Sequence, residues 1–291
     1  MSVAESPVPD RPHREHIDVF GLTHPGRVRS ENQDQFLIAS VHKSMRVVQA
    51  SIPREPMGDL LGPSYGHVLL VADGVGGNPG GRAASGTALN AIVDYVLRAM
   101  DLYVEFDAAL VPEFVSRLRR SMEHSHEAVR LAGQADEDQE GMATTLTMVY
   151  LRWPRAFIVH VGDCRGYRLR GGQLELLTKD QTMAQAMVDA GALSPAQAEQ
   201  STLRHILYSA LGASRAEPYI VTTDHQWDDR MLLCTDGLTK HVSDDEIRDA
   251  LQRMTSAETT ARGLLDLALE RGGSDNTTLI VGGLKLPVPA A

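Results

Sequence analysis

The chain has 291 residues and a formal net charge of −10, and 43% of its residues are hydrophobic, so it is long enough to bury a full core. The acidic balance argues against nucleic acid as a partner, because binding a phosphate backbone requires a basic surface. No stretch approaches the ~18 uninterrupted apolar residues of a membrane-spanning helix. Two cysteines, Cys164 and Cys234, are too few for a disulfide framework or a four-cysteine zinc site. We therefore expect a cytoplasmic monomer with no nucleic-acid or membrane partner.

The N-terminal residues 1–15 are rich in proline and charge and lack the apolar segment of a secretory signal, so we expect a short disordered lead. Residues 16–286 contain no internal repeat and no linker of Pro/Gly/Ser composition, which indicates a single domain followed by a short tail, 287–291. Within the domain, the Pro- and Gly-rich segment 42–66 is expected to be a surface loop.

Strands are predicted by apolar or alternating runs at 67–73, 143–151, 155–163, 165–178, 230–236 and 276–284. Helices are predicted by helical periodicity at 82–100, 112–133, 182–191, 195–200, 244–254 and 257–271. Gly171 and Gly172 supply the positive φ of a two-residue hairpin turn, and Ser243 with Glu246 forms a capping box. Because strands occur in hairpins and helices in consecutive pairs, the pattern favours an α+β fold, with antiparallel sheets covered by helices, over a doubly wound parallel sheet.

The glycine-rich stretch LLVADGVGGNPGG (69–81) follows a predicted strand and precedes a predicted helix, as a nucleotide-binding loop does. It matches neither known pattern. A dinucleotide fingerprint that starts at Gly74 needs glycine at the position of Pro79, and a phosphate loop that starts at Gly76 needs Lys-Ser/Thr after Gly81, where Arg82 and an alanine stand. A carboxylate at the mouth of such a loop would also repel a phosphate unless a cation lay between them.

Aspartates stand at the ends of the most apolar strands, mostly next to glycine: Asp34, Asp73, Asp163, Asp236 and Asp275. Carboxylates are rarely buried unless they are paired or bind a cation, and strand ends of a layered fold converge on one rim. Brought together without counter-charge, these groups would repel one another. Oxygen ligands without His or Cys point to Mg²⁺ or Mn²⁺. A single Asp-Gly is typical of a turn, but the joint pattern favours a metal centre.

Seven short motifs, in this order, resemble those of the metal-dependent protein Ser/Thr phosphatases of type 2C, in the bacterial branch of that family. They are RSENQD (29–34), DGVGG (73–77), GMATT (141–145), GDCRGY (162–167), LTKD (177–180), CTDGL (234–238) and SDNT (274–277). The resemblance covers roughly residues 16–284. It implies a four-layer α/β/β/α sandwich of two central antiparallel sheets flanked by pairs of helices, with a binuclear Mn²⁺ or Mg²⁺ site at one end of the sheets.

The resemblance also implies roles for the acidic residues. Asp73 bridges the two metals, and the carbonyl of Gly74 binds the second. Asp236 and Asp275 complete the ligands of the first metal. In the same way, Asp34 is implied to hold a metal-bound water.

Two further roles follow from the resemblance. Asp163 matches the ligand of a third, weaker metal in this branch. Arg29 matches the phosphate-binding arginine, whose fork suits two phosphate oxygens.

Four residues depart from the family pattern. Gln33 replaces an acidic metal ligand that some members carry, and Val75 replaces a histidine that eukaryotic members use as a proposed general acid. Lys240 stands where some members have a second ligand for the third metal, and Gln181 stands where a histidine usually follows LTKD. The segment 182–212 resembles the helical flap of bacterial members, with substrate contact and an ordinary surface hairpin both open as its role.

The resemblance implies hydrolysis of phosphoserine and phosphothreonine on proteins by a metal-bridging water or hydroxide, in opposition to a Ser/Thr protein kinase in bacterial signalling. Two alternatives stay open. Gln33 and Val75 permit a phosphatase-like module that binds phosphoproteins or senses metal without turnover. A shallow metal rim also permits a metallohydrolase that acts on small phosphate esters. His205 and His241 are either near the site or, as we prefer, ordinary, partly exposed polar residues.

Overall fold

The computed structural model describes residues 12–47, 58–75, 80–99 and 108–284. Two five-stranded antiparallel sheets form its centre. The first sheet has the strand order β1 (Ile17–His24), β12 (Thr277–Leu284), β11 (Arg230–Cys234), β8 (Arg165–Arg170) and β9 (Gln173–Leu176). The second has the order β10 (Tyr219–Asp224), β7 (Arg155–Val161), β6 (Leu146–Arg152), β3 (Gly58–Ala72) and β2 (Gln35–Val47).

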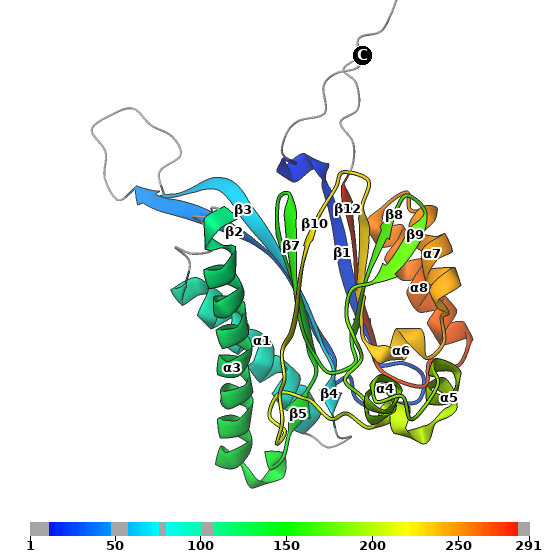
Figure 1. Ribbon diagram of the computed structural model, residues 1–291. Helices are drawn as coiled ribbons and strands as arrows, with labels where there is room; N and C mark the ends of the chain where they lie inside the picture. The colour runs from blue at the N-terminus through cyan, green and yellow to red at the C-terminus, as the bar shows by residue number, and fades with distance from the viewer. Residues whose placement is uncertain (1–11, 48–57, 76–79, 100–107, 285–291) are drawn as a thin grey trace, which may run out of the picture.

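Helices cover the outer face of each sheet (Figure 1). The long helices α1 (Gly80–Arg98) and α3 (Val111–Ala135) pack on the second sheet, and α7 (Asp244–Gln252), α8 (Ala257–Glu270) and the short α6 (Asp236–Thr239) pack on the first. The prediction of a four-layer α/β/β/α sandwich is therefore confirmed.

The alternating side chains of β3 show how the layers are joined. Leu70 and Ala72 belong to the apolar cluster under α1 and α3, whereas Leu69 and Val71 belong to the cluster between the two sheets. A strand buried on both faces reads as a continuous apolar run, as the stretch before Asp73 does. Each fully buried side chain of this kind contributes about 1.5–3 kcal/mol, so the end of β3 is firmly held.

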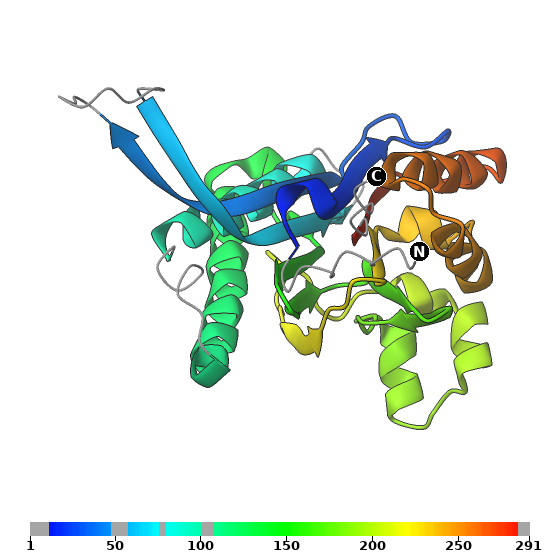
Figure 2. The ribbon, with the colours of Figure 1, turned by 90° about the horizontal axis from the view of Figure 1, so that it is seen from above.

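The segment 42–66 is not the surface loop that its composition predicted. Most of it belongs to β2 and β3, which continue as a hairpin that projects beyond the body of the sheet (Figure 1 and Figure 2). Residues 67–71 of β3 pair with β6 as well, whereas the outer part of the hairpin pairs with no further strand among the described residues. That part carries no alternating apolar pattern in the sequence. Residues 48–57 lie outside the described residues.

Two strands, β1 and β10, were also not predicted. Each is an edge strand of its sheet, and their side chains are mostly half-exposed, so neither has the apolar run of a central strand. The predicted strand 67–73 covers only the end of β3, whereas the remaining predicted strands and helices match within a few residues. Gly171 and Gly172 have φ of 53° and 78°, and the capping box of Ser243 and Glu246 is present.

Short elements complete the described part of the chain: η1 (Arg14–His16), β4 (Gly74–Val75), η2 (Ala108–Leu110), η3 (Glu137–Gln139), β5 (Ala143–Thr144), α4 (Met183–Asp189), α5 (Pro195–Gln200) and η4 (Thr202–His205). The helices α4 and α5 lie at the same end of the sandwich as β4 and α6 (Figure 1). The tail 287–291 and residues 1–11 of the expected lead lie outside the described residues. In the part of the chain that the structure describes, no helix combines the length and apolar character needed to cross a membrane.

Candidate metal and phosphate site

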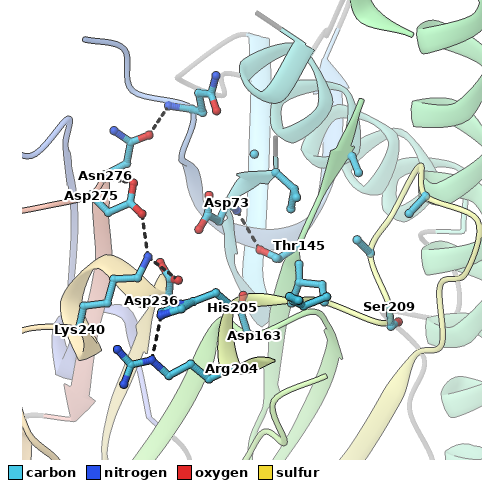
Figure 3. A pocket seen from close by; sticks show the side chains of 18 of the residues that line it. Asp73, Thr145, Asp163, Arg204, His205, Ser209, Asp236, Lys240, Asp275 and Asn276 are labelled. Carbon is cyan, nitrogen blue, oxygen red and sulfur yellow. Dashed lines mark hydrogen bonds and ion pairs between the residues drawn. The ribbon is translucent and has the colours of Figure 1, made fainter. Parts of the chain in front are cut away.

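The five predicted aspartates meet at one end of the sandwich because of strand direction. Asp34 precedes β2 and Asp73 follows its antiparallel partner β3; Asp275 lies just before β12, and Asp236 just after the neighbouring β11. Asp163 follows β7. All except Asp34 line one pocket of about 1,010 Å³ (Figure 3). Arg29 lines the same pocket. Asp34 lies behind the pocket, with 2% of its surface exposed.

The backbone of Asp73 is fixed by two threonines. Its amide donates to Oγ1 of Thr145 (3.0 Å), and its carbonyl accepts from Oγ1 of Thr144 (2.8 Å) and from the amide of Thr145 (2.9 Å). Next to it, a Cβ on Gly74 would lie 2.3 Å from the carbonyl oxygen of Gly81, so only glycine allows the first turn of α1 to approach this closely. The remaining glycines of the motif, at 76 and 77, lie outside the described residues.

Two carboxylate oxygens at the site are buried and have no hydrogen-bond partner in the described structure: Oδ1 of Asp34 and Oδ1 of Asp236. The other oxygen of Asp34 accepts a hydrogen bond from Oγ1 of Thr235 at 2.8 Å. A buried acceptor without a partner is costly, and a hard divalent cation is a partner that carboxylate oxygens favour. These orphaned oxygens are the observation on which the fit of Mg²⁺ or Mn²⁺ rests.

The carboxylates on the second sheet hold their protons unusually tightly. Burial, reinforced by the charges of Asp34 and Asp236, raises the pKa of Asp73 well above its ordinary value. Burial is also the main cause that raises the pKa of Asp34 to about 7 and the pKa of Asp163 to about 8, and the charge of Asp236 adds to both shifts. This half of the cluster is therefore short of positive charge.

The carboxylates on the first sheet are instead bonded to cations of the chain. Nζ of Lys240 lies 2.7 Å from Oδ2 of Asp236 and 2.7 Å from Oδ2 of Asp275 (Figure 3). Nε and Nη2 of Arg29 donate to the two oxygens of Asp275 at 2.8 and 3.0 Å. Burial alone would raise the pKa of Asp275, but the bonds from Arg29 and Lys240 outweigh burial and lower it.

The described residues do not form a closed metal cage. Among them, no three side chains of His, Cys, Asp or Glu converge closely enough to hold an ion by themselves. Like-charged carboxylates repel, and Asp236 and Asp275 here face Lys240 and Arg29. The residues thus fit a divalent cation by donor type, burial and orphaned oxygens, without showing the geometry of a filled site.

Residues 59–270 match the family described as Protein phosphatase 2C. The chain belongs to the protein phosphatase 2C family. The prediction from the ordered motifs is therefore confirmed. The matched region contains Asp73, Asp163 and Asp236 and leaves Arg29, Asp34 and Asp275 outside it.

Named relatives and solved structures agree with the family. Over 217 residues the chain is 37% identical to the serine/threonine protein phosphatase PstP of Mycobacterium tuberculosis, an alignment that spans 74% of this chain and 40% of PstP. It is 31% identical over 216 residues to the serine/threonine phosphatase stp of Listeria welshimeri, spanning 74% of this chain and 83% of that relative. The catalytic domain of PstP in complex with two manganese ions superposes with a TM-score of 0.71 and 30% identity, covering 93% of this chain and 99% of that domain.

Gln181, one of the departures from the phosphatase 2C pattern, has a structural role: its hydrogen bonds hold two neighbouring chain segments together. The amide of Gly162 donates to Oε1 of Gln181 (3.0 Å), the amide of Gln181 donates back to the carbonyl of Gly162 (2.7 Å), and Nε2 of Gln181 donates to the carbonyl of Glu217 (2.7 Å). Gln181 therefore holds the turn that carries Asp163. The sequence signal was its place directly after LTKD, but nothing in the sequence named its partners.

Asn276 was also missed as a residue that shapes the site. Its Nδ2 donates to the carbonyls of Pro25 and Glu31, and its Oδ1 accepts from the amide of Gln33. It thereby ties the loop of Arg29 to the start of β12. Its place in the SDNT motif is the only signal that the sequence offered.

The region 182–212 contributes to the pocket wall with residues of η4 and the segment after it: Arg204, His205, Ile206, Leu207, Tyr208, Ser209 and Ala210. His205 is exposed, and its Nε2 accepts a hydrogen bond from Nε of Arg204 at 2.8 Å. Burial and the charge of Arg204 lower the pKa of His205. His241 lines the pocket too and is bonded to Ser274. Both histidines thus line the pocket, which is the alternative that we did not prefer from the sequence, and they are also exposed (His205) or partly exposed (His241).

The two cysteines are buried and do not face the pocket chemistry. Sγ of Cys164 lies 3.0 Å from Oγ1 of Thr145, and burial together with the charge of Asp73 raises the pKa of its thiol well above the ordinary value. Burial raises the pKa of Cys234 to about 12. Both thiols stay protonated and act as small apolar fillers.

Proposed function

We propose that this chain hydrolyses phosphoserine and phosphothreonine esters on proteins with Mn²⁺ or Mg²⁺ as cofactor, and that it opposes a Ser/Thr protein kinase. The observation that carries the proposal is the cluster of aspartates with two orphaned buried oxygens, which adjoins the same pocket as Arg29. Membership of the phosphatase 2C family and relatives that are named Ser/Thr phosphatases support it.

The cofactor would be held by oxygen donors of the chain. We assign Asp73, Asp236, Asp275 and the carbonyl of Gly74 as ligands of two ions and Asp163 as a ligand of a third. Such ions supply acidified water near neutral pH and neutralise the charge of the phosphoryl group.

The other residues bind phosphate and handle protons. Arg29 has half of its side chain exposed, and its planar fork can bind two phosphate oxygens side by side. We assign to Asp34 the role of orienting the attacking water and accepting its proton, because one of its oxygens is fixed by Thr235 and the other has no partner among the described residues. Val75 lines the pocket and has no proton to give, so the leaving serine or threonine oxygen takes its proton from solvent.

The shape of the pocket favours a protein substrate over a small ester. It extends from the aspartates to Tyr208 and Arg215 in the region after α5, which leaves space for residues on either side of a phosphorylated side chain. A phosphate monoester alone would fill only a small part of about 1,010 Å³. We therefore propose phosphorylated proteins as partners, with a Ser/Thr kinase acting on the same substrates.

The decisive experiment measures phosphate release from a phosphothreonine peptide with Mn²⁺, with chelator, and with the variant Asp236→Asn. We expect release that needs Mn²⁺ and that Asp236→Asn abolishes, whereas Asp189→Asn, on the exposed surface of α4, retains it. Peptide binding without release by the wild type would point instead to a non-catalytic module. A higher kcat/KM on nucleotides than on phosphopeptides would point to a small-ester hydrolase.

A further inference from the structure

Lys240 directly follows the last turn of α6 and reaches back to two of the assigned ligands. Its ammonium is 2.7 Å from Oδ2 of Asp236 and 2.7 Å from Oδ2 of Asp275, distances typical of charge-assisted hydrogen bonds. The backbone amide of Lys240 also donates to the carbonyl of Asp236 at 2.9 Å, which fixes the start of the side chain. One cation of the chain therefore joins the carboxylate after β11 to the carboxylate before β12.

The three other aspartates of the cluster lack such a partner. Among the described residues, Asp34, Asp73 and Asp163 take part in no ion pair with a lysine or arginine. Within the described part of the chain, lysine or arginine thus pairs with Asp236 and Asp275 and with no other aspartate of the cluster. The side chain of Lys240 is 24% exposed and lines the pocket, so it has space into which it can turn.

We propose that Lys240 is an internal counter-ion of Asp236 and Asp275, which a divalent cation must displace, and that it thereby sets the metal affinity of this site. The inference rests on the proposed function for the assignment of these two aspartates as ligands. An ammonium and a divalent cation cannot share the same carboxylate oxygens, because at contact distance their repulsion is large even at the effective dielectric of a protein surface. Lys240 is a positioning residue in this proposal.

Release of Lys240 would also change the phosphate side of the pocket. In the structure Arg29 and Lys240 are both bonded to Asp275, so both positive charges are partly neutralised by it. A cation that takes over Asp275 leaves the ammonium in the pocket beside the guanidinium of Arg29. Metal binding then makes this pocket more positive in two ways: it adds the charge of the metal ion, and it releases the charges of Lys240 and Arg29 from Asp275. Both changes favour the binding of a phosphate dianion.

The test is a calorimetric titration of the metal-free full chain with Mn²⁺. We expect Lys240→Met to bind the first Mn²⁺ about 10-fold to 100-fold more tightly than the wild type, because the competing charge is gone. Lys240→Arg, which keeps the charge, should stay near the wild type. Lys179→Met is the matched control, because Lys179 pairs with Asp189 on the exposed surface outside the pocket. The Mn²⁺ affinity of this variant should equal that of the wild type.

An unchanged or weaker Mn²⁺ affinity of Lys240→Met would overturn the proposal. Structural damage alone would weaken Mn²⁺ binding, so an increase in affinity can be attributed to the loss of the competing charge. If Lys240→Met does not fold, Lys240→Gln takes its place with the same expectation. The titration needs no turnover. If the variant binds Mn²⁺ more tightly but the wild type does not hydrolyse phosphopeptides, the proposed function is wrong and this inference stands. If the wild type hydrolyses phosphopeptides but the variant does not bind Mn²⁺ more tightly, the proposed function stands and this inference is wrong.

Discussion

In the first sheet, Asp236 and Asp275 are bonded to Lys240, and Asp275 is bonded to Arg29 as well, whereas the aspartates of the second sheet have no such cation among the described residues. The pKa of Asp275 is lowered, while burial and like charges raise the pKa of Asp73 well above its ordinary value. One fold thus carries buried carboxylates in two ways. It neutralises one half of the cluster with its own side chains and leaves the other half dependent on protons or ions from solution.

The strongest test of this contrast compares Asp73→Asn with Asp275→Asn. Both variants should lose phosphopeptide hydrolysis by about 10³-fold, as expected when charge stabilisation of the transition state is removed. In chelator their stabilities should move in opposite directions. Asp73→Asn replaces a buried carboxyl, whose charged form is disfavoured by burial and by its neighbours, with a neutral amide, so its melting temperature should rise. Asp275→Asn leaves Arg29 and Lys240 without their shared partner, so its melting temperature should fall. Shifts of the same sign in calorimetry would refute the division into two halves.

A smaller effect is expected at Arg29, which belongs to the neutralised half. Arg29→Ala should lower kcat/KM on a phosphothreonine peptide by about 100-fold, because a preorganised donor to the phosphate is lost. Arg29→Lys should recover only part of the loss, since an ammonium cannot bond two oxygens side by side. Steady-state kinetics with Mn²⁺ measures both values. Full recovery by Arg29→Lys would show that charge alone, and not the fork, is what the pocket uses.

The smallest expected effect is on stability and concerns the half without cations. The pKa values of Asp34 and Asp163 are about 7 and about 8 in the folded chain against an ordinary 3.8, so the folded state binds more protons than the unfolded state between these values. Stability of the metal-free protein should therefore fall as pH rises from about 4 and level off above about 8, with a loss of roughly 5–10 °C in melting temperature.

Scanning calorimetry in chelator across this pH range measures the effect. Saturating Mn²⁺ is the matched control, because a bound cation replaces the protons and should flatten the profile. A metal-free melting temperature that rises with pH over the same interval would contradict the assignment of Asp34 and Asp163 as the unneutralised carboxylates.

Much of the fold could be predicted because the central strands carry their own signals. The run before Asp73 is apolar since β3 is buried on both faces, and glycines follow it where chain segments approach closely. Prediction failed where strands are not buried on both faces: at the edge strands β1 and β10 and in the outer part of the β2–β3 hairpin. They lie at or beyond the margin of the core, where burial imposes no pattern on the sequence.

The placement of Arg29 and four of the five aspartates around one pocket could also be predicted, but the hydrogen bonds and ion pairs among them could not. Aspartates next to glycine at strand ends indicated which side chains meet. The spacing of Asp236 and Lys240 by four residues was a visible signal for an ion pair, since such residues are neighbours on a helix. The second partner, Asp275, precedes a different strand, and its position beside Asp236 is set by the register of β11 against β12, which no local spacing encodes.

The burial of Cys164 and Cys234 has a consequence for signalling under oxidative stress. A thiol reacts with peroxide as its thiolate, and both of these thiols are buried with a raised pKa. The cluster of aspartates contains no sulfur to oxidise. Under the proposed function, oxidation of these thiols would not change the rate at which a phosphate mark is removed, so the steady-state level of that mark would follow kinase activity rather than thiol oxidation.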